Sequence, residues 1–148
     1  MVRNVIHAGI TVSDLNVSIP FYTDLLGLKL IKLEEPRSAR GEKLGVPGAV
    51  IQCAVFETAD GAESVELIQY FKPDSPDGGG APVNTVGNVH IAFRVDDIDS
   101  MIREMKSKGV VFMSDNYEVI GDGPLAGWKW IYFKDPDGTN LELIEETL

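Results

Sequence analysis

Hydrophobic and polar residues alternate along several short segments of the chain, and such alternation predicts β-strands. Two runs with helical spacing interrupt these segments, at about 15–26 and about 97–108. Each half of the chain is therefore expected to form a strand, a helix and three further strands. The expected strands lie at about 4–12, 28–35, 49–57 and 63–71, and then at about 87–95, 110–119, 127–134 and 139–146.

The two predicted helices differ in how clearly they are bounded. In the second helix, Asp96 is placed to cap the N-terminus, and Gly109 suits the left-handed residue that follows the C-terminus. The first helix contains Pro20, whose missing N–H is tolerated only in the first turn. We therefore expect that the regular part of this helix begins near Val17, after an irregular start.

The two halves of the chain resemble each other, which predicts an internal duplication. Residues 7–15 align with residues 90–98, and residues 65–69 align with residues 141–145. Each half thereby has one His on a predicted strand near its start and one Glu on a predicted strand near its end.

A run of prolines and glycines at 72–82 separates the halves and forbids a continuous strand or helix there. We expect one domain of two modules, at about 4–71 and about 87–146, joined by a linker at about 72–86. Near the end of the chain, residues 135–138 have the sequence Asp-Pro-Asp-Gly, which is typical of a type I turn. This turn predicts a hairpin between the last two strands.

Composition and charge narrow the class of protein. The 148 residues are 44% hydrophobic and 24% charged, which is typical of one globular domain. The chain has 13 Lys and Arg against 23 Asp and Glu, so we expect neither nucleic acid nor a membrane surface as a partner. Cys53 is the single cysteine, and the first residues lack the apolar segment of a secretion signal. A cytoplasmic protein is expected.

The repeated His and Glu residues form a set with metal-ligand chemistry. The alternation places His7 and His90 on the strand faces opposite their apolar neighbours. Glu66 and Glu142 lie in mostly apolar strands, where an ionised carboxylate needs a partner. Two imidazoles and two carboxylates suit Mn²⁺, Fe²⁺, Co²⁺, Ni²⁺ or Zn²⁺. For any one of these residues a structural role is the alternative, but the duplication of the set favours metal binding.

Aromatic residues mark a candidate substrate surface. Trp128, Trp130 and Tyr132 share one face of a predicted strand, and Tyr70 lies on another strand. This arrangement suits an aromatic or flat ligand if the face looks into a cavity. The alternative is that these residues form core or dimer contacts.

Cationic residues supply further candidates for binding a substrate. Arg94 shares its strand face with His90. Arg40 lies with Arg37 and Lys43 in the glycine-rich segment 36–48, which would cover the site and hold an anion. The alternative for this segment is a set of solvated loop charges.

The pattern of His, Glu, His and Glu on duplicated βαβββ modules, with FYTDLLGL at 21–28 and DPDGTNLEL at 135–143, resembles the vicinal oxygen chelate superfamily. The similarity covers essentially the whole chain. It implies an α+β fold in which two tandem βαβββ modules form an eight-stranded, open, barrel-like sheet around one divalent metal ion. The same resemblance implies a homodimer and a small-molecule substrate bound through vicinal or carbonyl oxygens. The implied metal ligands are His7, Glu66, His90 and Glu142.

The activity favoured by this resemblance is that of a metal-dependent epimerase or racemase, which removes and returns a proton beside a carbonyl. Glu142 is preferred as the base and Glu66 as the acid, since they belong to opposite repeats. A purely structural ligand role is the alternative for each. An aromatic ketone, such as an isoflavanone of the dihydrodaidzein type, and an acyl-CoA thioester are the candidate substrates.

Other activities of similar proteins remain as alternatives. A glyoxalase-type lyase would act on another hemithioacetal, because the Arg and Asn that hold glutathione in bacterial glyoxalase I are replaced by Thr11 and Tyr70. Methylmalonyl-CoA epimerases usually have Gln at the position of Glu66 and an acid in the third strand, which this chain lacks at 49–56. Bleomycin-resistance-like proteins sequester ligands without a full metal set. In an extradiol-type dioxygenase, Glu66 would crowd the open coordination positions.

Overall fold

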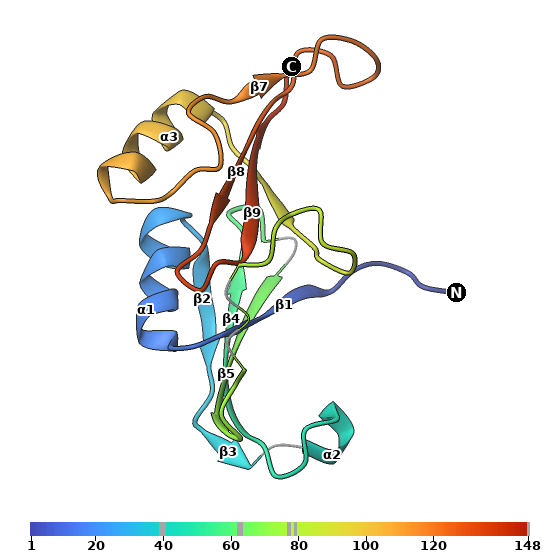
Figure 1. Ribbon diagram of the computed structural model, residues 1–148, viewed down its shortest axis with the longest axis vertical. Coiled ribbons are helices and arrows are strands. Elements are labelled where there is room, and N and C mark those ends of the chain that lie inside the picture. Colours follow the sequence, from blue (N-terminus) through green and yellow to red (C-terminus); the bar gives the residue numbers. More distant parts are fainter. Residues whose placement is uncertain (39–40, 62–63, 77, 79, 148) are drawn as a thin grey trace. The chain divides into compact units, whose positions relative to one another are not determined.

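The computed structural model describes residues 1–38, 41–61, 64–76, 78 and 80–147 (Figure 1). The chain divides into two compact units, Met1–Asp77 and Gly78–Leu148. Each unit contains one β-sheet, five-stranded in the first and four-stranded in the second. None of the helices formed by these residues is long and apolar enough to cross a membrane.

The sheet of the first unit has the strand order β1-β5-β4-β2, with β3 paired to β4. β1 runs parallel to β5, whereas β5, β4 and β2 pair in antiparallel fashion. The short helix α2 (Gly41–Leu44) follows β3. The strands are β1 (His7–Val12), β2 (Lys29–Leu33), β3 (Arg37–Ser38), β4 (Val50–Glu57) and β5 (Ser64–Lys72).

The first helix of this unit is irregular at its end and not at its start. α1 (Leu15–Pro20) begins where the side chain of Asp14 accepts a backbone N–H of the first turn. After Pro20, the chain widens into the π-helix η1 (Phe21–Leu25), in which the N–H of Leu26 donates to the carbonyl of Phe21. The predicted irregular start near Val17 is therefore wrong. Because the helix already begins at Leu15, Pro20 lies inside it and cannot donate to the carbonyl of Asn16 four residues earlier.

One face of the first sheet forms the hydrophobic core of its unit. Tyr22 of η1 and Phe56 of β4 are fully buried, and their ring centroids lie 6.0 Å apart. Leu67 of β5 and Val12 of β1 are buried as well, and α1 packs against β5. Because strand side chains alternate, the neighbouring residues of β1 and β5 point to the other face, as predicted. That face carries the polar residues described below.

The second sheet repeats the connectivity of the first. Its order is β6-β9-β8-β7, so in both units the first strand lies parallel to the last and the remaining pairs are antiparallel. The α+β class and the tandem open-sheet modules are thus confirmed. The elements are β6 (Ile91–Arg94), α3 (Ile98–Ser107), β7 (Glu118–Val119), β8 (Lys129–Lys134) and β9 (Asn140–Glu145).

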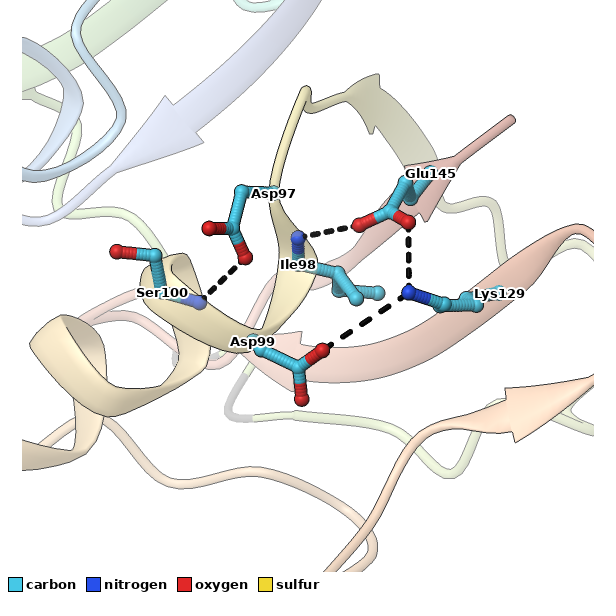
Figure 2. A network of polar contacts seen from close by, with 6 residues as sticks. All are labelled: Asp97, Ile98, Asp99, Ser100, Lys129 and Glu145. Carbon is cyan, nitrogen blue, oxygen red and sulfur yellow. Dashed lines mark hydrogen bonds and ion pairs between the residues drawn. The ribbon is translucent and has the colours of Figure 1, made fainter. Parts of the chain in front are cut away.

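A network of polar contacts joins the start of α3 to the sheet (Figure 2). Asp97 caps the helix by accepting the N–H of Ser100 at 2.8 Å, so the prediction of Asp96 as the cap is wrong by one residue. The N–H of Ile98 donates to Glu145 of β9 at 2.7 Å, and Lys129 of β8 binds the other oxygen of Glu145 at 2.7 Å. Gly109 follows the helix with a φ of 82°, as expected.

The predicted strand at 110–119 is mostly absent. Only β7 and an isolated bridge between Phe112 and Phe133 pair with β8. Between them, the hydroxyl of Ser114 donates to the carbonyl of Asn116, so local side-chain bonds replace the strand ladder. The predicted hairpin at 135–138 is confirmed, because it joins β8 and β9 and the N–H of Gly138 donates to the carbonyl of Asp135 at 3.0 Å.

Candidate metal and substrate site

In the first unit, His7 and Glu66 form a pair on the face of the sheet opposite the core. The parallel register of β1 and β5 aligns Gly9 with Glu66 and places His7 two residues before that point. The Nε2 atom of His7 lies 3.4 Å from Oε2 of Glu66. Among the described residues, chain neighbours aside, no atom lies within 4 Å of the position that a Cβ on Gly9 would take, so space remains beside the carboxylate. The predicted partners meet within their own module.

In the second unit, His90 and Glu142 form the equivalent pair. His90 directly precedes β6 and does not lie within it, although a strand over about 87–95 was expected. Its Nε2 atom lies 3.2 Å from Oε2 of Glu142 on β9. Glu142 is only 8% exposed, and burial raises the pKa of its carboxyl, although His90 acts in the opposite direction. A carboxyl of this kind is suited to accept a proton.

Tyr132 of β8 lies against the second pair. Its hydroxyl oxygen is 3.2 Å from Nε2 of His90, and the two rings meet edge to face with centroids 5.0 Å apart. Burial and the charge of Glu142 raise the pKa of Tyr132, so the hydroxyl stays protonated at neutral pH. One nitrogen of His90 thus contacts both a carboxylate and a phenol. The sequence marked Tyr132 only as part of an aromatic face.

Cys53 lies close to both Glu66 and Glu34 in the first unit, and sequence reasoning assigned neither Cys53 nor Glu34 to the site. Burial raises the pKa of the Cys53 thiol to about 11, and the carboxylates of Glu66 and Glu34 add to this effect. The thiol is therefore protonated at neutral pH and is no nucleophile. Glu34 pairs with Arg37 and Lys32, which balance its charge. The available signal was the spacing of two residues between Lys32 of β2 and Glu34, which directly follows the strand.

A pocket of about 240 Å³ lies beside Glu142 in the second unit. The predicted aromatic residues Trp128 and Trp130 line this pocket together with Tyr132. Sequence reasoning missed Ile120 and Leu125, because they belong to the irregular segment between β7 and β8 and follow no periodic pattern. The complete lining is Ile120, Leu125, Trp128, Trp130, Tyr132, Glu142 and Ile144.

Two of the other predicted substrate contacts, Tyr70 and Arg94, are not part of this pocket lining. Tyr70 packs against the buried cluster of Ala49, Ile51 and Cys53 in the first unit. Arg94 binds Glu146, with its Nε 2.9 Å from Oε1. Arg40 lies outside the residues that the structure describes.

The spacing of each His–Glu pair fits the ligands of a metal ion. Two donor atoms that are each about 2.1 Å from one ion, at an angle of about 100°, are about 3.2 Å apart. The observed distances are 3.4 Å for His7 and Glu66 and 3.2 Å for His90 and Glu142. A direct charge-assisted hydrogen bond is shorter, at about 2.7–2.9 Å. Within the described residues, no group of three or more His, Cys, Asp or Glu side chains is assembled, and each unit holds one His–Glu pair.

The chain belongs to the Glyoxalase/Bleomycin resistance protein/Dioxygenase superfamily, whose family model matches residues 4–143. A 2-epi-5-epi-valiolone epimerase from Actinomyces is 31% identical over 143 residues, covering 93% of this chain and 76% of that protein. A lactoylglutathione lyase from Haemophilus influenzae is 27% identical over 143 residues, covering 95% and 91%. The predicted vicinal oxygen chelate membership is confirmed, and the chain has an isomerase and a lyase among its relatives.

The fold is also that of solved members of this group. The crystal structure of a glyoxalase family protein from Bacillus cereus matches with a TM-score of 0.85 at 24% identity, covering 100% of this chain and 97% of that one. This likeness concerns the fold.

Proposed function

We propose that this protein is a metal-dependent epimerase or racemase that moves the proton beside a carbonyl group of a small metabolite. The observation that carries the proposal is the buried Glu142, which lies 3.2 Å from His90 and belongs to the lining of the aromatic pocket. A carboxylate with little exposure, beside a space for an organic ligand, is suited to proton transfer. The epimerase among the relatives supports the same class of reaction.

The proposed metal ligands are the two His–Glu pairs. A divalent ion held by them would polarise the carbonyl oxygen and stabilise the negative charge that develops when the neighbouring carbon loses a proton. The support is the mixed nitrogen and oxygen donor set and the donor spacing within each pair. Family membership supports the assignment of both pairs to one ion.

The carboxylates have distinct roles in this proposal. Glu142 accepts the proton of the α-carbon at a carboxylate oxygen, since burial raises its pKa and therefore its affinity for a proton. Glu66 of the other repeat returns a proton, which inverts the carbon if the two act from opposite sides. Tyr132 orients the ring of His90 through the edge-to-face contact of the two rings.

The residues at the expected glutathione positions favour an isomerase over glyoxalase I. Thr11 and Tyr70 stand where bacterial glyoxalase I has an Arg and an Asn, and neither supplies a cation. Tyr70 is also packed against Cys53 and its neighbours. A substrate with the two carboxylates of glutathione would lack these anchors.

The test is exchange of the α-proton for deuterium, followed by NMR in D₂O. The protein is stripped with a chelator, reloaded with Mn²⁺, Co²⁺, Ni²⁺, Fe²⁺ or Zn²⁺, and mixed with α-chiral ketones and thioesters. We expect metal-dependent exchange that is lost in Glu142→Gln and His7→Ala. Glu146→Gln is the matched control, because Glu146 pairs with the exposed Arg94 and lies outside the pocket lining.

Each other outcome has a definite meaning. Exchange that survives both site substitutions would contradict the assignment of Glu142 and the metal ligands. A stoichiometric metal without exchange would favour a lyase or an oxygenase. Tight ligand binding without any metal would favour a sequestering protein.

A further inference from the structure

We infer that the pocket of the second unit binds a flat, uncharged aromatic ring, so that the substrate is a carbonyl compound that carries an aryl group. This inference rests on the proposed function, since it names the substrate class of the same site. Three properties of the pocket carry the inference: its aromatic lining, the charge of the lining side chains and its volume.

The flat faces of aromatic side chains form much of the pocket lining. Trp130 and Tyr132 meet edge to face, with ring centroids 5.6 Å apart and an interplanar angle of 82°. Tyr132 is in turn fixed against His90. Since these rings are held in place by one another, they offer a preformed surface on which another ring can stack or meet edge to face. Trp128, Ile120 and Leu125 complete the apolar lining.

The charge of the lining excludes an anionic ring substituent. Among the described residues that line the pocket, Glu142 is the one charged side chain. The nearby Lys129 does not line the pocket, and its ammonium group is 2.7 Å from Glu145. A carboxylate or phosphate among the aromatic rings would therefore lose its hydration with no cationic side chain in the lining to pair with it. A neutral ring meets no such penalty.

The size of the pocket limits the buried part of the ligand. A cavity of about 150 Å³ accommodates benzene. The pocket here measures about 240 Å³, which leaves room for one ring and the group attached to it. Because Glu142 belongs to the same lining, a carbon attached to the bound ring is brought to the proposed base.

The two tryptophans provide a direct test, because they are the only two in the chain and both line the pocket. Their indole N–H signals are followed in ¹H–¹⁵N spectra of the full chain, with and without bound metal. Three probes are titrated: 1-indanone, cyclopentanone and the anion 1-indanone-5-carboxylate. We expect saturable shifts of both indole signals with 1-indanone, and at least tenfold weaker binding of the other two probes.

Substitutions at two similarly exposed leucines distinguish an effect on the pocket from a general effect of an added charge. Leu125 lines the pocket and is 44% exposed, whereas Leu33 of β2 is 50% exposed and belongs to the first unit. We expect Leu125→Asp to weaken the binding of 1-indanone at least tenfold and Leu33→Asp to change it less than twofold. Both variants are checked for native dispersion of their spectra before titration.

The inference fails if 1-indanone gives no saturable shift, if the carboxylate binds as tightly, or if Leu125→Asp binds as well as the wild type. Failure of the proposed function gives a different result. If 1-indanone binds but 2-methyl-1-indanone shows no deuterium exchange, the pocket assignment stands and the proton-transfer proposal fails. Exchange of 2-methylcyclopentanone as fast as that of 2-methyl-1-indanone would support the reaction and overturn the aromatic preference.

Discussion

The hydroxyl of Tyr132 lies 3.2 Å from Nε2 of His90, the same nitrogen that is 3.2 Å from Glu142. Because Nε2 is also the proposed metal-binding atom, the hydroxyl and a metal ion would compete for this nitrogen. We therefore expect Tyr132→Phe to raise metal affinity by up to about tenfold, which is the net worth of one hydrogen bond. Metal affinity measured by competition with a chelator, beside the exchange rate, checks this.

Tyr117→Phe is the control for that substitution. Tyr117 lies under Lys129, whose ammonium is 5.3 Å from the ring centroid, and it is not part of the pocket lining. Its substitution is expected to leave metal affinity unchanged. If Tyr132→Phe binds metal and catalyses exchange like the wild type, the hydroxyl contributes only to packing.

The number of metal ions per chain tests whether both His–Glu pairs serve one ion. If they do, purified protein binds one equivalent, and either His7→Ala or His90→Ala lowers the affinity by at least tenfold. If each pair binds its own ion, the wild type binds two equivalents of metal and each His→Ala variant binds one. Elemental analysis after dialysis against limiting metal distinguishes these results. Asp60→Ala, in a loop of the first unit, serves as the control.

The sequence predicted the strand faces and the presence of one His and one Glu in each module, because side chains alternate along a strand and the two halves repeat. It could not predict Ile120 and Leu125 in the pocket, since they lie in an irregular segment. It also could not predict that Arg94 is bound by Glu146, because the two are 52 residues apart and meet only in the folded sheet. Features that follow from the alternation of side chains were therefore predictable from the sequence. Contacts made by irregular segments, or by residues far apart in the sequence, were not.

Glu145 makes the stability of the second unit depend on acid pH. Its hydrogen bond from the N–H of Ile98, and then that from Lys129, lower the pKa of the carboxyl below its ordinary value of 4.5. The stabilising contribution is present above the unfolded pKa and is lost as the pH falls through the lower, folded value. Figure 2 shows both contacts.

We expect Glu145→Gln to unfold more easily than the wild type at pH 7 and to differ less from it once the pH lies below the folded pKa. Urea unfolding at a series of pH values from about 3 to 7 measures this. Glu146→Gln, which loses only the ion pair with the exposed Arg94, is expected to change the free energy of unfolding little at any pH. A constant difference between Glu145→Gln and the wild type across this range would contradict the assignment.

Two adjacent aspartates precede α3, and the structure distinguishes their roles. The side chain of Asp97 accepts the N–H of Ser100 at 2.8 Å, which satisfies one of the unpaired donors of the first turn. We expect Asp97→Ala to lower the free energy of unfolding by about 1 kcal/mol. Asp96→Ala should change it by less than about 0.5 kcal/mol, as surface substitutions usually do. Chemical denaturation of both variants at pH 7 measures the difference, and equal effects would mean that the cap is shared or that charge alone stabilises this end of the helix.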